Sequence, residues 1–174
     1  MRFTVRPSAA SELDRGDPGA LALQNALRKA RAARAQAPGA SEAVLGCDTL
    51  VALGGTIYGK PSDEDAARRT LRALSGATHE VISGLALLLP GDRSEIVQRT
   101  AIARTEVTFR TLQDDLLDWY LEKGEWRGRA GAYAIQGAGS ALVRAVRGDY
   151  ENVVGLPLAA LLDIYPELLS ARSS

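Results

Sequence analysis

The sequence is poor in several residue types, and each scarcity excludes a class of protein. It has one cysteine, Cys47, and one histidine, His79, among 174 residues. A lone cysteine cannot form a disulfide within the chain, which fits a reducing compartment, and a histidine-based zinc site would lack ligands. No stretch approaches about 20 consecutive apolar residues, and the N-terminus lacks the apolar core of a signal peptide. We therefore expect a cytoplasmic protein with no membrane span.

An excess charge of either sign is also missing. Lys and Arg together number 21, as do Asp and Glu. No net field therefore draws the protein toward nucleic acid or a membrane surface, although a small anionic ligand needs only local positive charge. The apolar content of 46% is ordinary for a globular protein, and no linker or internal repeat divides the chain. We expect one domain that spans residues 1–174.

Apolar periodicity and turn residues predict a chain in which strands and helices intermix. Strands are expected at residues 3–5, 43–53, 57–58, 80–89, 95–109 and 141–146, and helices at residues 19–36, 63–74, 111–123 and 156–169. Asp17, Ser62 and Thr111 can cap the first three helices, and Gly54-Gly55 can form a hairpin turn. This order argues for an α/β or α+β fold in one domain.

One carboxylate interrupts the apolar run of residues 43–53, and it belongs to Asp48. An ionised aspartate is costly to bury without a partner, so a strand that carries one usually holds it against a cation. The rigid turn Gly59-Lys60-Pro61 could bring the Lys60 ammonium to the same place. Taken singly, a turn-capping aspartate and an exposed loop lysine are equally good interpretations. Together, the two charges suit a metal–phosphate substrate.

The segment of residues 128–139 is rich in glycine, which lets a backbone approach a ligand closely and present amide donors. It lacks the Gly-Lys-Ser/Thr of a phosphate-binding loop and the strand–turn–helix of a dinucleotide site. On composition alone, a structural loop is the better interpretation. Within it, the Gln136 carboxamide could pair with the edge of a base, and Tyr133 could stack on a ring or pack in the core.

Other polar or reactive residues give weaker signals. We interpret Cys47 as a small core residue, because no histidine lies nearby in sequence to activate it. His79 is expected to stabilise the turn before its strand. Lys29 belongs to a basic stretch that usually forms a solvated helix face, and it could reach a phosphate only if that helix flanks the cleft.

Five ordered blocks of sequence are similar to the Maf family of nucleoside triphosphate pyrophosphatases, and the resemblance runs from about residue 3 to residue 169. The blocks are Val44-Leu45-Gly46-Cys47-Asp48-Thr49, Gly59-Lys60-Pro61, Leu74-Ser75-Gly76 with Thr78-His79-Glu80-Val81, Gly131-Ala132-Tyr133-Ala134-Ile135-Gln136-Gly137, and Asn152-Val153-Val154-Gly155-Leu156-Pro157. Pro7-Ser8 with Glu12 matches a further segment of the family, and Lys29 matches its helix lysine. The resemblance implies an α/β domain with a long, twisted, mixed sheet flanked by helices.

The resemblance also implies an activity, the hydrolysis of nucleoside triphosphates to monophosphate and pyrophosphate with Mg²⁺ or Mn²⁺. Asp48 would hold the metal or accept a proton from the attacking water, and Glu12 would be a second metal-side carboxylate. Lys29 and Lys60 would neutralise the triphosphate. The substrate-binding residues would also include those near the base, which are Thr49, Tyr133 and Gln136. The Tyr-Ala-Ile-Gln sequence looks like the dTTP/UTP-directed branch.

The resemblance leaves alternatives open. A related inosine or xanthosine triphosphate pyrophosphatase is the rival within the same class, and a nucleotide-binding or septum-formation regulatory protein with little catalysis is the rival from another class. A homodimer is expected by resemblance only. No polymeric nucleic acid is expected as a partner.

The front of the family pattern has no counterpart in this sequence. The first apolar strand and a Ser-x-Ser-Pro-Arg-Arg loop are missing before Met1, and Gly128-Arg129 stands where many members have Asp-Lys. We expect either that the native start lies upstream or that a shortened protein has weak or no hydrolase activity. For the chain as written, which lacks this strand, we expect lower stability and weaker triphosphate affinity than in a full-length relative.

Overall fold

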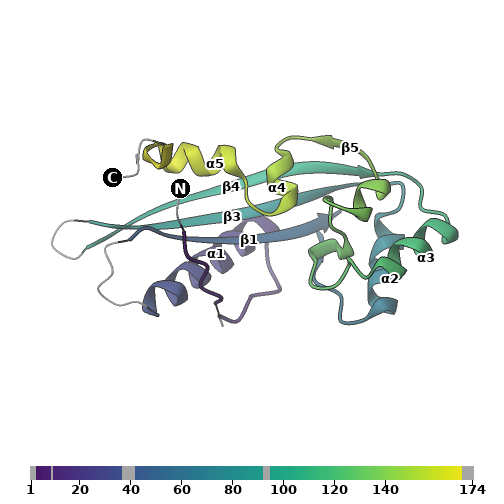
Figure 1. Cartoon of the computed structure of the whole chain (residues 1–174), viewed down its shortest axis with the longest axis horizontal. Helices are drawn as coiled ribbons and strands as arrows, with labels where there is room; N and C mark the ends of the chain where they lie inside the picture. Colours follow the sequence, from purple (N-terminus) through teal and green to yellow (C-terminus); the bar gives the residue numbers. More distant parts are fainter. Residues whose placement is uncertain (1–2, 9, 37–41, 92–94, 170–174) are drawn as a thin grey trace.

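The computed structural model describes residues 3–8, 10–36, 42–91 and 95–169. Within these ranges, strands and helices intermix along the chain as expected (Figure 1). The elements are α1 (Pro18–Ala35), β1 (Val44–Leu53), β2 (Thr56–Tyr58), α2 (Glu64–Leu74), β3 (Thr78–Pro90), β4 (Ile96–Phe109), α3 (Asp114–Lys123), β5 (Val143–Arg147), α4 (Tyr150–Val154) and α5 (Leu158–Ile164). Short 3₁₀ turns cover Ala130–Ala132, Ala138–Leu142 and Pro166–Leu169.

The sheet has the strand order β2-β1-β3-β4-β5. The long strands β3 and β4 pair along their whole length, from Thr78 opposite Thr108 to Pro90 opposite Ile96. The α/β class is confirmed, but every pairing among the described strands is antiparallel, whereas a mixed sheet was expected. Two of the four neighbouring pairs, β1 with β2 and β3 with β4, follow one another with no helix between them, and strands joined in this way run antiparallel.

Helices cover both faces of the sheet, as Figure 1 shows. Helix α1 packs on β1 and β3, and α5 packs on β4 and β3 from the opposite face. Helices α2 and α3 lie together beyond one end of the sheet (Figure 1). No helix within the described ranges is both long and apolar enough to cross a bilayer.

Two glycines let α1 lie directly on the sheet. A Cβ atom on Gly46 would stand 2.2 Å from the Ala26 carbonyl oxygen, and one on Gly84 would stand 2.4 Å from the Ala22 backbone. The helix meets this surface through small side chains, and Ala22, Ala26 and Ala30 are fully buried. Because these alanines and glycines let the helix lie close to the strand, polar side chains of α1 reach the functional groups of β1.

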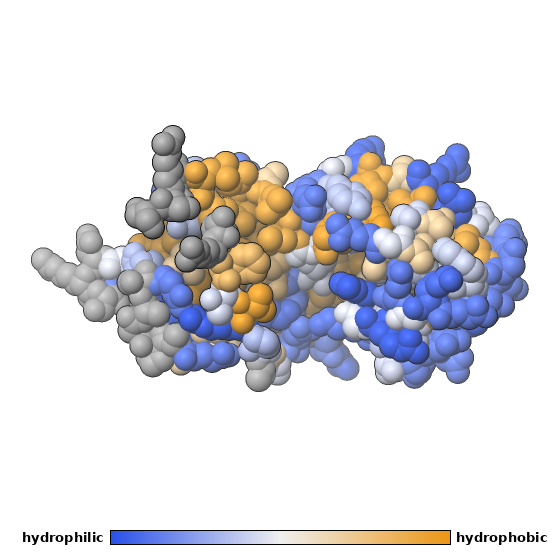
Figure 2. All heavy atoms as spheres, viewed as in Figure 1, coloured by the Kyte–Doolittle hydropathy of each residue, from blue (hydrophilic) through white to orange (hydrophobic). Residues whose placement is uncertain are grey.

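The main core lies at the other end of the sheet, where α2, α3 and the glycine-rich loop pack around β1, β3 and β4. Its largest fully buried members are aromatic or leucine side chains: Tyr120, Phe109, Leu71, Leu74, Leu117, Leu121 and Leu142. On the face of the molecule drawn in Figure 2, apolar side chains gather over the half that carries α5, and the half that carries α2 and α3 is mainly hydrophilic. The core therefore anchors one wall of the site, and α1 forms the opposite wall.

Four local predictions were wrong. Residues 3–5 form no strand, because they pair with no other strand. Asp63, and not Ser62, caps α2, since its carboxylate accepts a hydrogen bond from the Ala66 amide. Helix α3 begins at Asp114 without a side-chain cap, three residues after Thr111. The expected helix at residues 156–169 is broken after Ile164, before Pro166, whose ring cannot continue it.

Candidate functional site

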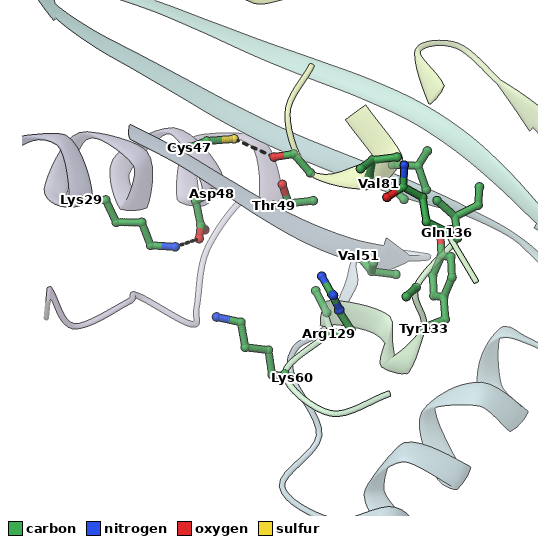
Figure 3. A pocket seen from close by; sticks show the side chains of 17 residues that line it. Lys29, Cys47, Asp48, Thr49, Val51, Lys60, Val81, Arg129, Tyr133 and Gln136 are labelled. Carbon is green, nitrogen blue, oxygen red and sulfur yellow. Dashed lines mark hydrogen bonds and ion pairs between the residues drawn. The ribbon is translucent and has the colours of Figure 1, made fainter. Parts of the chain in front are cut away.

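The site is a cavity of about 300 Å³ that wraps around the outer edge of β1. Strand β2 pairs only with Val51–Leu53, so no described strand covers the preceding part of that edge. Side chains from both faces of β1 line the cavity, and α1, the loop before α2 and the glycine-rich loop complete its walls (Figure 3). Six of the seven residues predicted for the site line it, namely Lys29, Asp48, Thr49, Lys60, Tyr133 and Gln136.

Asp48 is the buried anion of this cavity, with 5% of its surface exposed. The Lys29 ammonium of α1 lies 2.5 Å from Asp48 Oδ1, and Asn25 Nδ2 donates a hydrogen bond of 3.0 Å to Oδ2. Asn25 and Lys29 are one helical turn apart, so they present donors to the same carboxylate side by side. The cation that the sequence required for Asp48 is thus Lys29, and Lys60 is farther out.

Glu12 extends the charge pattern outward. Its carboxylate lies 2.7 Å from Lys29 Nζ and 3.3 Å from Lys60 Nζ. It borders a second hollow that shares Lys29 and Cys47 with the main cavity. Two carboxylates and two ammonium groups therefore alternate in one chain, from buried Asp48 to exposed Lys60.

Contacts among these charged groups shift the pKa of Glu12 and that of Lys29 in the direction that favours the charged form. The hydrogen bond from Lys29 lowers the pKa of Glu12 below its ordinary value, against the opposing effect of partial burial. Burial by itself would lower the pKa of Lys29, but the hydrogen bonds to Asp48 and Glu12 outweigh it, so this pKa is raised. The site therefore offers fixed ammonium groups to an anion and carboxylates to a cation.

The other end of the cavity carries groups suited to a flat polar ring. Gln136 is exposed into it, and Val81 and Tyr133 stand beside Gln136 in Figure 3. Thr49 lies between the two ends, and its hydroxyl is hydrogen-bonded to that of Ser83 at 2.8 Å. Tyr133 was expected either to stack on a ring or to pack in the core. It packs in the main core, where it is 6% exposed, and it also borders the cavity.

His79 does not stabilise a turn, contrary to expectation. It lies within β3 with 1% exposure, and its Nε2 is hydrogen-bonded to the Tyr133 hydroxyl at 3.0 Å. Its ring meets those of Phe109 and Tyr133 edge to face. Burial lowers the pKa of His79 to about 4, so the ring is neutral at pH 7. It packs against Tyr133 and is hydrogen-bonded to its hydroxyl.

Cys47 was expected to be a small core residue, but its side chain is half-buried and lines both hollows. Its Sγ lies 3.2 Å from the Gly155 carbonyl oxygen, and burial raises the pKa of the thiol to about 11. The thiol is therefore protonated at neutral pH and unsuited to attack a substrate.

Sequence reasoning missed two residues of the site. Asn25 is a neutral residue on an alanine-rich helix, and its neighbours in sequence give no sign that it faces Asp48. Arg129 borders the cavity between Lys60 and Gln136, whereas the sequence marks it only as a departure from a family pattern. Its position after the glycine-rich turn was the available signal, since a guanidinium there suits phosphate oxygens.

Fold and site together define an α/β protein with a cavity at a sheet edge, in which ammonium groups suited to a small anionic ligand lie beside carboxylates. Comparison with known proteins gives the family: the Maf-like protein family matches residues 1–168, and the chain belongs to it.

Several relatives carry a functional name. The dTTP/UTP pyrophosphatase of Anaeromyxobacter dehalogenans (strain 2CP-C) is 48% identical over 91% of this chain and 79% of its own. That of Pyrococcus furiosus is 41% identical over 92% of this chain and 82% of its own. That of Deinococcus radiodurans is 44% identical over 84% of this chain and 71% of its own.

Proposed function

We propose that this protein hydrolyses nucleoside triphosphates to monophosphate and pyrophosphate, and that dTTP and UTP are its preferred substrates. The observation that carries the proposal is the cavity with a lysine–carboxylate chain at one end and a carboxamide at the other. The names of relatives at 41–48% identity support the same activity. The proposal assigns the charged end to the phosphates and the Gln136 end to the base.

The reaction consumes one water molecule and yields two products, the nucleoside monophosphate and pyrophosphate. The water oxygen attacks the α-phosphorus, and the bond from that phosphorus to the bridging oxygen of the β-phosphate breaks. Pyrophosphate leaves with the bonding electrons, and the water proton passes to a nearby base, for which Asp48 and Glu12 are the carboxylates within the site. Lys29, Lys60 and Arg129 stabilise charge that builds on the phosphate oxygens.

A divalent cation such as Mg²⁺ or Mn²⁺ belongs to the proposal. No group of three histidine, cysteine or acidic side chains is gathered in the residues that the structure describes. Mg²⁺ nonetheless needs only one or two carboxylates, because water and substrate phosphates complete its shell. Asp48 and Glu12 fit this donor set, since both contact the same ammonium group of Lys29. The cation would neutralise phosphate charge there.

Gln136 at the base end can pair with a base that carries a protonated ring nitrogen beside a carbonyl, as N3 does in uracil and thymine. Uracil and thymine present an N–H donor beside a carbonyl acceptor, and the carboxamide of Gln136 offers the matching acceptor and donor. Cytosine presents the reverse order at the same edge. Selection for uracil and thymine over cytosine therefore needs the Gln136 amide fixed in one orientation.

Pyrophosphate release tests the proposal. The chain is incubated with each common ribo- and deoxyribonucleoside triphosphate, with Mg²⁺ or Mn²⁺, in ¹⁸O-labelled water. We expect turnover of dTTP and UTP, with the label in the monophosphate, and loss of at least about 100-fold in Asp48→Asn. Label in pyrophosphate would mean attack on the β-phosphorus. A preference for inosine triphosphate would favour the purine rival, and binding without turnover would favour a regulatory protein.

A further inference from the structure

Asn25 connects the two carboxylates of the site although it does not border the main cavity. It lies on α1 with 1% exposure. Its Nδ2 donates to Asp48 Oδ2 at 3.0 Å and to the Leu13 carbonyl oxygen at 3.1 Å. Its Oδ1 accepts a hydrogen bond of 2.7 Å from the Leu13 amide. Asn25 thus holds Asp48 directly and holds Glu12 through the backbone of the next residue.

These three contacts allow only one orientation of the Asn25 amide. The Leu13 N–H needs an acceptor, whereas the Leu13 carbonyl and the Asp48 carboxylate need donors. A flipped amide would set oxygen against carboxylate and N–H against N–H. Both Nδ2 hydrogens are used, so the pairing is specific as well as buried.

We propose that Asn25 is the positioning residue that fixes Asp48 and Glu12 in one arrangement around Lys29. The segment that carries Glu12 has no helix or strand of its own, so its placement depends on side-chain contacts. Asn25 supplies two partly buried hydrogen bonds to the Leu13 backbone, and Arg28 supplies an exposed one of 2.7 Å to Ser11, beside the ion pairs that Lys29 and Lys60 make with Glu12. The consequence for catalysis rests on the proposed function, whereas the consequence for geometry does not.

Three variants separate positioning from simple stabilisation. Asn25→Leu keeps the side-chain size and removes all three hydrogen bonds. Asn25→Asp keeps an acceptor for the Leu13 amide but loses the donors to Asp48 and to the Leu13 carbonyl. Arg28→Met is the matched control on the same helix, because it removes the exposed contact to the same segment and leaves both carboxylates untouched.

Hydrogen–deuterium exchange on the ligand-free proteins tests the geometry. In Asn25→Leu we expect the Leu13 amide to exchange at least about 10-fold faster than in wild type, because its buried acceptor is gone. Asn25→Asp retains that acceptor and is expected to keep most of the protection. Arg28→Met is expected to change the exchange of Leu13 by less than about 3-fold. Unchanged exchange in Asn25→Leu would overturn the proposal.

Steady-state kinetics at a temperature where all variants are folded test the catalytic consequence. Asn25→Leu and Asn25→Asp should lose about 10- to 100-fold in kcat, with KM for UTP changed much less, since the lysines that hold the phosphates remain. Arg28→Met should keep the wild-type kcat. A fall in melting temperature with kcat per folded molecule unchanged would mean that Asn25 only stabilises the fold.

The failure of the proposed function can be told apart from the failure of this inference. If wild type releases no pyrophosphate from any triphosphate, the proposed function fails. The exchange data and a crystal structure of Asn25→Leu then decide the inference alone. Displacement of Glu12 and rotation of Asp48 would support it, and unmoved carboxylates would contradict it.

Discussion

Lys29 and Lys60 share a carboxylate partner, Glu12, but their surroundings give them different energetic roles. The Lys29 side chain is 24% exposed and neutralises buried Asp48, whereas the Lys60 side chain is 53% exposed. Loss of one partner of a buried pair leaves an uncompensated charge, while a surface pair contributes about 0–1 kcal/mol. Lys29 therefore acts on stability as well as on the substrate, and Lys60 acts mainly on the substrate.

Substitution of either lysine by methionine tests this difference. Lys29→Met should lower the free energy of unfolding by on the order of 2 kcal/mol, because Asp48 keeps only its bond to Asn25. Lys60→Met, the matched control, should change it by less than about 0.5 kcal/mol. Urea unfolding at pH 7.5 measures both values.

The double variant Lys29→Met with Asp48→Asn isolates the charge itself. The neutral amide at position 48 no longer needs a cation. The double variant should therefore have a higher free energy of unfolding than Lys29→Met alone. If the two single losses simply add, the pair makes no specific contribution.

Single residues of the site were predictable where they broke a pattern. Asp48 interrupts an apolar strand and Lys60 stands on a rigid turn, and the structure brings both to one cavity. The actual partner of Asp48 was harder to assign, because Lys29 stands among arginines in a basic stretch that usually forms a solvated helix face. Asn25 was not predictable, since its contact to Leu13 follows from a loop without regular structure. His79 was misassigned because its partner Tyr133 is 54 residues away.

At the scale of elements, the site depends on the close approach of α1 to β1 and β3. Gly46 sets that approach, and Gly46→Ala would place a methyl group 2.2 Å from the Ala26 carbonyl. The helix would have to move outward, which should cost about 1–3 kcal/mol of stability and draw Lys29 away from Asp48. We expect both the unfolding free energy and the turnover of UTP to fall.

Gly59→Ala is the control for this variant, because a Cβ there meets nothing within 4 Å and its φ is not positive. It should change stability by less than about 0.5 kcal/mol. Wild-type stability and turnover in Gly46→Ala would show that α1 can shift without effect on the site.

The regular elements were predictable because their periodicity is local. The long strands, the helix from Pro18 and its Asp17 cap, and the stop of α3 at Gly124 were all confirmed. Expectations failed where distant contacts decide, as at residues 3–5, for which no pairing strand exists among the described residues. The close packing of α1 was also hidden, since a glycine in a strand looks the same whether a helix or solvent covers it.

At the scale of the whole molecule, burial of His79 couples global stability to pH. Its pKa is about 4 in the folded protein, against 6.5 for an exposed histidine. The unfolded chain therefore binds a proton between pH 6.5 and 4 that the folded protein does not, so stability falls as the pH falls through this window. At pH 5 the loss relative to pH 8 should be about 2 kcal/mol from this residue.

Urea unfolding of wild type and His79→Gln at pH 8, 6 and 5 measures the effect. Glutamine does not titrate, so the difference in stability between the two proteins should narrow by about 2 kcal/mol from pH 8 to pH 5. A constant difference across this range would mean that the pKa of His79 is the same in the folded and the unfolded protein.

Ligand binding should also be visible in global stability, because Lys29, Lys60 and Arg129 line one cavity although the chain as a whole has no net charge. An α,β-imido analogue of UTP cannot be cleaved at the attacked bond and reports binding alone. At 100 times its Kd, a ligand specific for the folded state adds about 2.7 kcal/mol, which for a protein of this size raises Tm by about 5–10 °C.

UMP lacks the two phosphates that would meet Lys29 and Lys60, so it should give a much smaller shift at equal concentration. Lys60→Met should reduce the shift of the analogue without changing that of UMP. Equal shifts with UMP and the triphosphate analogue would instead place all the binding at the base end and leave the lysine–carboxylate chain without a role in holding the substrate.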